Sequence, residues 1–369
     1  MSQPPREITM MQAITVIVSS IIGVGVLALP LFAVQAANSG APLVTLLGSL
    51  LATFGLSLIA MLGMRFPDQS IILYSEVIIG KWLALLGNLA IFFFFAMLTS
   101  LTAREFGEVV VTSVLKNTPV EVTVIVMLVL AAISSRNNIT TFAYIHFFYF
   151  PLLLVPALII VALSLKTAET IYLQPIYGNA PTNLLQGTLV IAALFQPAFV
   201  MSIIIPYMKN PQKAIHSSLW GLLIAGGLYV MIVIAAVSRF GSEEILKLLW
   251  PFLELAKATS LPANILERID AAFLAVWVTA VFTTLLTSYF MTIYSLTAML
   301  KLKDHKMFSI FFLPVIFILA MQPKSIISMY STITIFGKIG LVLTIGYPGI
   351  LLLIAILRKK KGGTVDPYH

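Results

Sequence analysis

The sequence has 369 residues, of which 60% are hydrophobic and 10% are charged, with no cysteine and a formal net charge of +8. Soluble domains are usually about 25% charged, so this composition excludes a water-soluble globular protein and indicates a multi-pass membrane protein. The lack of cysteine excludes disulfides, thiolate catalysis and Cys-based metal sites. We expect the positive charge to lie in cytoplasmic loops, and we expect no nucleic-acid partner, no cofactor and no enzymatic activity.

Apolar segments of about 20 residues predict helices that cross the bilayer, whose hydrocarbon core is about 30 Å thick. The first segment is of spanning length, so we expect it to be retained rather than cleaved as a signal peptide. The ten expected spans are 10–34, 42–63, 83–103, 119–135, 142–165, 184–208, 215–238, 270–300, 307–322 and 333–357. We therefore predict an all-α membrane protein in which residues 1–369 form a single transmembrane domain.

Lys and Arg residues predict the orientation, because they concentrate in cytoplasmic loops. With the N-terminus in the cytoplasm, the inner loops carry most of them, the long outer loop at 239–269 being set aside. Both termini are therefore expected to be cytoplasmic.

The first span contains SSIIGVGVLALP at residues 19–30, where Gly23 and Gly25 flank Val24. Glycine is a poor helix former, which predicts an interruption and a second half-helix that begins near Val24 to Leu27. The first amides of that half-helix are free and carry the positive end of its dipole. A carboxylate would fit there, although glycines in membrane helices also serve close packing.

The sixth span contains LFQPAFVMS at residues 194–202, with Pro197 near its centre. Proline removes one helical hydrogen bond, so carbonyls around Leu194 to Gln196 are expected to be free to accept from an ammonium group. The alternative is a simple kink. Together, the two breaks predict a site for an amino acid zwitterion.

The span lengths suggest two repeats of five helices, at about 10–165 and 184–357. In these repeats the short spans 4 and 9 correspond, as do the interrupted spans 1 and 6. Because five is odd, the second repeat is inverted relative to the first. Inverted repeats with broken first helices are typical of transporter-type folds with a midplane site.

Spans 3 and 8 are expected to supply the other walls of this site. Span 3 offers Phe94, Phe95, Leu98 and Thr99. Hydroxyl groups gather in span 8, where they could hold an ion or could simply bond to the helix backbone. They belong to Thr283, Thr284, Thr287 and Ser288, with Tyr289 beside them.

No Asp, Glu, Lys or Arg is expected firmly at the midplane, where ionisable groups normally mark proton relays. His146 is expected to be a packed, hydrogen-bonded side chain. Lys338, in the outer third of span 10, is expected to snorkel towards the interface. The outer loop 239–269 is amphipathic, which suits either a lid or a docking face for another protein.

Three segments carry a family resemblance: FPDQSIILYSEVIIGKW at 66–82, SRNNITTFAYIHFFYFPLLLV at 135–155 and ERIDAAFLAVWV at 267–278. Their order and spacing, together with the ten spans and the IIGVGVLALP break, resemble the B subunits of spore germinant receptors (GerAB-type spore germination permeases). This family is a branch of the amino acid–polyamine–organocation superfamily, and the resemblance covers essentially the whole chain.

The resemblance implies a LeuT-like 5+5 fold with broken helices 1 and 6, in the inner membrane of a spore. It implies a receptor that binds a small nutrient, often an amino acid, and acts with an A subunit and a lipoprotein C subunit. Many superfamily members have a glycine at the sixth-span break, where this chain has Gln196, Pro197 and Ala198. The expected ligand-binding residues are Gly23, Val24, Gly25, Leu27, Phe95, Thr99, Phe195, Gln196, Pro197, Ala198, Phe199, Thr287, Ser288 and Tyr289.

Two other functions fit the same residues. An amino acid permease would need the same pocket, and only the lack of a midplane relay favours sensing. A purely structural membrane scaffold would have a filled core and would show no ligand dependence.

Overall fold

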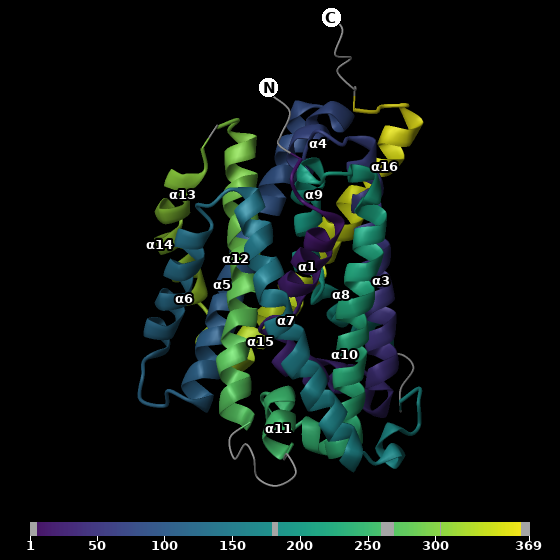
Figure 1. Ribbon diagram of the computed structural model, residues 1–369, viewed down its shortest axis with the longest axis vertical. Coiled ribbons are helices and arrows are strands. Elements are labelled where there is room, and N and C mark those ends of the chain that lie inside the picture. The colour runs from purple at the N-terminus through teal and green to yellow at the C-terminus, as the bar shows by residue number, and fades with distance from the viewer. Residues whose placement is uncertain (1–5, 179–183, 260–268, 303, 363–369) are drawn as a thin grey trace, which may run out of the picture.

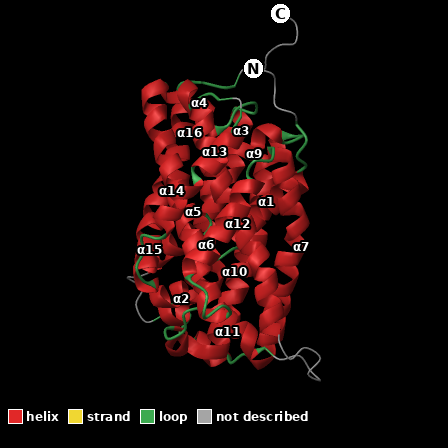
Figure 2. Cartoon of the chain, turned by 90° about the vertical axis from the view of Figure 1, so that its left-hand side faces the viewer, coloured by secondary structure: helices red, strands yellow, loops and turns green. Residues whose placement is uncertain are grey.

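The computed structural model describes residues 6–178, 184–259, 269–302 and 304–362. These residues are almost entirely helical (Figure 2), with a β-bridge between Ile8 and Met208. The helices form an elongated bundle in which α4 (Ile71–Ile79) and α16 (Tyr347–Leu357) lie at one end and α11 (Pro251–Ala258) at the other (Figure 1). The segments expected on the inner and outer sides therefore lie at opposite ends.

Six helical stretches in the described residues are long and apolar enough to cross a membrane, and a seventh arises when a pair bent by 50° counts as one span. Shorter apolar helices complete the set, so the helical content is consistent with ten spans, and the exact number stays a prediction. The corresponding helices are α1 (Met10–Ile21) with α2 (Gly25–Ala37), α3 (Ala41–Arg65), α5 (Lys81–Ser113), α6 (Val120–Ser134), α7 (Ile139–Ser164), α8 (Leu184–Ala193) with η5 (Gln196–Val200) and α9 (Met201–Ile204), α10 (Ala214–Ile245), α12 (Ile269–Met299), α13 (Lys306–Phe311) with α14 (Leu313–Ala320), and α15 (Ile326–Leu341) with α16. Short connecting turns are η1 (Asn38–Gly40), η2 (Leu165–Thr167), η3 (Thr170–Leu173), η6 (Ile205–Tyr207), η7 (Pro211–Lys213) and the π-helical η9 (Val342–Gly346).

Polar caps fix where several helices begin. At the start of α1, Thr9 and Gln12 form a reciprocal capping box, in which the Thr9 amide donates to Gln12 Oε1 at 2.8 Å. Asn138 Oδ1 accepts from the Thr141 amide at 2.7 Å, which starts α7. Ser325 caps α15 in the same way. These contacts satisfy amides that have no acceptor within their own helix.

The helices differ from the expected spans at several places. Helix α5 continues to Ser113, ten residues beyond the expected end of span 3 at 103. Arg104 and Glu108 pair across one helical turn at 2.7 Å within this extension and stabilise it. Span 9 is divided into α13 and α14 at Phe312. Span 10 begins at Ile326 rather than 333. The outer loop 239–269 contains the end of α10 and all of α11, and its residues 260–268 lie outside the described part.

The interrupted helices occupy the centre of the bundle. Helix α1 packs against α7, α10 and α12, and α2 packs against α8, α10 and α11. Ile17 and Leu27 are fully buried in these two helices. Small residues permit this close packing: a Cβ at Gly23 would lie 2.2 Å from the Thr284 hydroxyl, so only glycine fits there.

Candidate functional site

The first span is interrupted between Ile21 and Gly25, at the position expected from the glycines. Among the described residues, the amides of Gly23, Val24, Gly25 and Val26 have no hydrogen-bond acceptor, and the Leu27 amide bonds only within its own turn, to the Val24 carbonyl at 3.1 Å. These amides begin α2, so the positive end of its dipole lies among them.

The carbonyl groups of the same break are satisfied by side chains from other helices. Tyr229 of α10 donates its hydroxyl to the Ile21 carbonyl at 2.8 Å. Thr283 of α12 donates to the Ser19 carbonyl at 2.9 Å, and Trp277 donates its indole N–H to the Gly23 carbonyl at 3.3 Å. The break therefore presents donors and few acceptors, which suits an anionic group.

The break in the sixth span presents a hydrogen-bond acceptor instead of donors. Helix α8 ends at Ala193, and the next helical turn starts at Gln196, with a bend of 50° between the two parts. Pro197 has no N–H, and the carbonyl of Leu194 has no donor in the part of the chain that the structure describes. Gln196 holds this break against α15, since its side-chain Nε2 donates to the Gly337 carbonyl at 2.6 Å.

A cavity of about 90 Å³ lies between the two breaks. This volume is enough for several water molecules or one small ligand. Its lining includes Val24 and Gly25 from the first break and Leu194, Gln196 and Pro197 from the second. The remaining lining residues come from six helices, α1, α2, α5, α8, α12 and α15: Ile21, Phe32, Phe94, Leu98, Leu101, Thr102, Glu105, Val190, Ala193, Thr284, Ile333, Thr334 and Gly337.

The structure brings only part of the expected binding set to this cavity. Of the expected ligand-binding residues, Val24, Gly25, Gln196 and Pro197 line it. Phe94 and Leu98 of the expected span 3 wall and Thr284 of the expected ion site line it as well. The other expected ligand-binding residues do not line this cavity, and Phe195, Ala198 and Phe199 line a separate cavity of about 20 Å³ beside α3. The residues that do not line the first cavity are Gly23, Leu27, Phe95, Thr99, Phe195, Ala198, Phe199, Thr287, Ser288 and Tyr289.

Several of these residues have defined packing roles instead. Phe95 is fully buried, with its ring 5.7 Å from that of Phe199. Thr99 donates to the Phe95 carbonyl at 2.6 Å. Ser288 donates to the Leu285 carbonyl at 3.1 Å.

The hydroxyls proposed for an ion form a hydrogen-bonded network with α1 and α7. Thr287 shares a hydrogen bond with Ser20 Oγ at 2.9 Å and another with His146 Nε2 at 3.2 Å. Thr283 and Thr284 both donate to the Ser19 carbonyl. Backbone and histidine bonds therefore account for these hydroxyls, and an ion site here stays a prediction. His146 is fully buried and hydrogen-bonded, as expected.

Sequence reasoning missed Glu105 because span 3 was expected to end at 103. Glu105 lies within α5, is 6% exposed and lines the cavity, and the expectation of no ionisable residue firmly at the midplane stays a prediction. The spacing of Arg104 and Glu108, four residues apart with opposite charges, favours a continuing helix and could have revealed it. Thr102 and Thr334 were missed as well. Lys338 is exposed on α15.

Comparison with known proteins decides the family. The family described as "Spore germination protein" matches residues 7–329, most of the chain. The chain belongs to this family. Among its relatives, spore germination protein YndE of Bacillus subtilis is 26% identical over 98% of this chain and 99% of its own length. Spore germination protein B2 of Bacillus subtilis is 24% identical over 98% of this chain and 99% of its own length.

Solved structures show the fold of this family member. The nucleobase-cation-symport-1 family transporter Mhp1, with bromovinylhydantoin bound, has a TM-score of 0.70 and 15% identity over 97% of this chain and 81% of its own. MhsT in complex with L-phenylalanine has a TM-score of 0.67 and 12% identity over 95% of this chain and 89% of its own. The protein is thus a multi-pass membrane protein with a LeuT-like transporter fold.

Proposed function

We propose that this protein is the membrane subunit of a nutrient germinant receptor, and that it binds a small nutrient, an amino acid, in the cavity between the two broken helices. The observation that carries the proposal is the chemical contrast across this cavity. The free amides of the first break and the free Leu194 carbonyl of the second match the carboxylate and the ammonium group of one zwitterion. The relatives named for spore germination supply the biological context.

Contacts at the inner ends of the broken spans support a coupled movement. The Ile8 amide donates to the Tyr207 carbonyl at 2.9 Å, and the Lys209 amide donates to the Ile8 carbonyl at 2.8 Å. The inner halves of spans 1 and 6 are therefore tied together. A ligand that bridges both breaks would favour one arrangement of this pair against the surrounding scaffold, which is a population shift.

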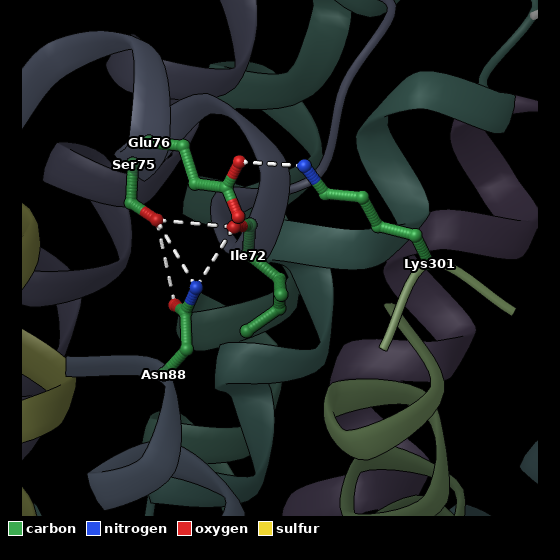
Figure 3. Close-up of polar contacts among 5 residues, drawn as sticks. All are labelled: Ile72, Ser75, Glu76, Asn88 and Lys301. Atoms are coloured by element: carbon green, nitrogen blue, oxygen red, sulfur yellow. Dashed lines mark hydrogen bonds and ion pairs between the residues drawn. The ribbon is translucent and has the colours of Figure 1, made fainter. Parts of the chain in front are cut away.

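The inner helix α4 is a second element that such a movement would affect. Figure 3 shows its polar contacts: Asn88 of α5 donates to the Ile72 carbonyl at 2.9 Å, and Lys301 at the end of α12 pairs with Glu76 at 3.0 Å. We propose that this side faces the cytoplasm, in the spore inner membrane, and that an A subunit and a lipoprotein C subunit sense the change.

The substitution Gly25→Leu tests the binding cavity. A Cβ at Gly25 meets only Leu194 Cδ2 at 3.3 Å, so the backbone tolerates a side chain whose remaining carbons would enter the cavity. We expect normal expression and loss of amino acid-induced germination in spores that carry this receptor alone. Gly227→Leu is the matched control, because nothing lies within 4 Å of its Cβ position. Equal sensitivity of both variants and the wild type would reject the site.

Transport of amino acids, as in a permease, is the second candidate function, because the fold neighbour Mhp1 is a transporter. Proteoliposomes that contain this chain alone separate the two functions. The receptor proposal predicts ligand binding without accumulation of labelled amino acid, and concentrative uptake would overturn it in favour of the permease.

A further inference from the structure

Glu105 is an acidic residue to which the proposed function gives no role. Its side chain lines the cavity from α5 and is more than nine-tenths buried. Its Oε1 atom has no hydrogen-bond partner among the described residues. An unpaired carboxyl group in such surroundings is costly, because burial removes the hydration that stabilises its charge. A positively charged group of a bound ligand would stabilise this carboxyl group.

The neighbouring charges on the same helix do not neutralise Glu105. Arg104 pairs with Glu108 at 2.7 Å, and its Nη1 atom lies 3.6 Å from Met321 Sδ. The residues that line the cavity include no Lys, Arg or His. Among the residues that the structure describes, the lining of this cavity thus has a carboxyl group and no cationic side chain.

Another acceptor shares the cavity with Glu105. The carbonyl of Leu194 lacks a donor in the described residues, and Leu194 belongs to the lining. The donors lie at the first break, in the amides of Val24 and Gly25. A ligand with a protonated amine would satisfy the acceptors, and a ligand that also carries a carboxylate would use the amides.

We propose that Glu105 is a binding residue that pairs with a protonated amine of the ligand. The ligand class is therefore small amines, of which small amino acids fit the donors and the acceptors together. This inference rests on the proposed function, since it names the chemistry of the same cavity. Uncharged nutrients such as sugars would leave the carboxyl group without a cationic partner.

Binding to the purified full chain in nanodiscs tests the inference. The probes are glycine, L-alanine and L-serine, the 2-hydroxy acids in which a hydroxyl replaces the amine of each, and glucose and inosine as uncharged nutrients. A hydrogen bond to a charged group is worth about 1.5–3 kcal/mol, so Glu105→Gln should raise the Kd for amino acids by about tenfold or more. The Kd for 2-hydroxy acids should not rise. Glu108→Gln makes the same chemical change outside the cavity and should leave amino acid affinity unaltered.

The outcomes separate this inference from the proposed function. If amino acids bind Glu105→Gln as tightly as the wild type, the inference fails and the binding site stands. If the wild type binds glucose or inosine and no amine, the inference also fails, while nutrient binding survives. If the wild type binds none of the probes, both fail. If Glu105→Gln does not fold, Glu105→Asp is tested instead. This variant keeps the carboxyl group but places it one methylene further from the cavity. Amino acid affinity should then fall selectively, and equal losses for amino acids and 2-hydroxy acids would overturn the inference.

Discussion

Removing the hydroxyl of Tyr229 tests how the first break is maintained. Tyr229 is fully buried in α10, and its hydroxyl donates to the Ile21 carbonyl, at the last residue of α1, at 2.8 Å. In Tyr229→Phe this buried carbonyl loses its side-chain donor, which costs about 1–3 kcal/mol. We expect the upper part of this range, because there is little water at membrane depth to replace the bond.

The assay is the free energy of unfolding of the purified chain, measured in one detergent at one protein concentration, together with amino acid affinity. Tyr330→Phe is the matched control: its hydroxyl donates to the Leu249 carbonyl at 3.3 Å in a more exposed place, so its net loss should be about 0.5–1 kcal/mol. Tyr229→Phe should also weaken ligand binding, because the amides of the break lose part of their support. Equal losses of stability in the two variants, with unchanged affinity, would refute the view that side chains hold the break open.

Three further predictions concern packing and specificity. Gly23→Ala places a Cβ 2.2 Å from Thr284 Oγ1 and should destabilise the protein by about 1–3 kcal/mol, whereas Gly25→Ala should fold normally; a comparison of melting temperatures decides this. Asn88→Ala removes buried hydrogen bonds of α4 and should cost about 1–3 kcal/mol, while Lys301→Ala breaks an exposed ion pair and should cost at most about 1 kcal/mol; urea unfolding that ranks them in the opposite order would contradict this. Leu98→Ala enlarges the cavity and should shift dose–response curves towards larger amino acids; superimposable curves would show that Leu98 does not contact the ligand.

Local chemistry was sufficient to predict the positions of both breaks. Gly23 and Gly25 weaken the helix at the sites where they stand, and Pro197 removes a donor wherever it is placed. These effects depend on the residues themselves and hardly on their neighbours in space. The same holds for the apolar segments, because each span must satisfy its backbone within its own helix. The sequence was therefore a reliable guide to the membrane class and to the interrupted spans.

The walls of the cavity could not be predicted in the same way. Phe95 and Leu98 lie within one turn of each other on α5, yet only Leu98 lines the cavity, because the rotation of the helix against its neighbours decides which side chain faces inwards. The hydroxyl of Thr287 was expected to face a ligand, and it bonds to Ser20 and His146 instead.

Glu105 shows the same division between sequence and structure. A charged residue near the expected end of an apolar segment has the pattern of a loop residue, and only the continuation of α5 to Ser113 brings it into the bundle. The sequence by itself determined that the chain spans the membrane and where its helices are interrupted, since those properties arise from consecutive residues. The tertiary structure alone decided which side chains meet in the cavity, because residues far apart in the chain become neighbours only through the packing of one helix against another.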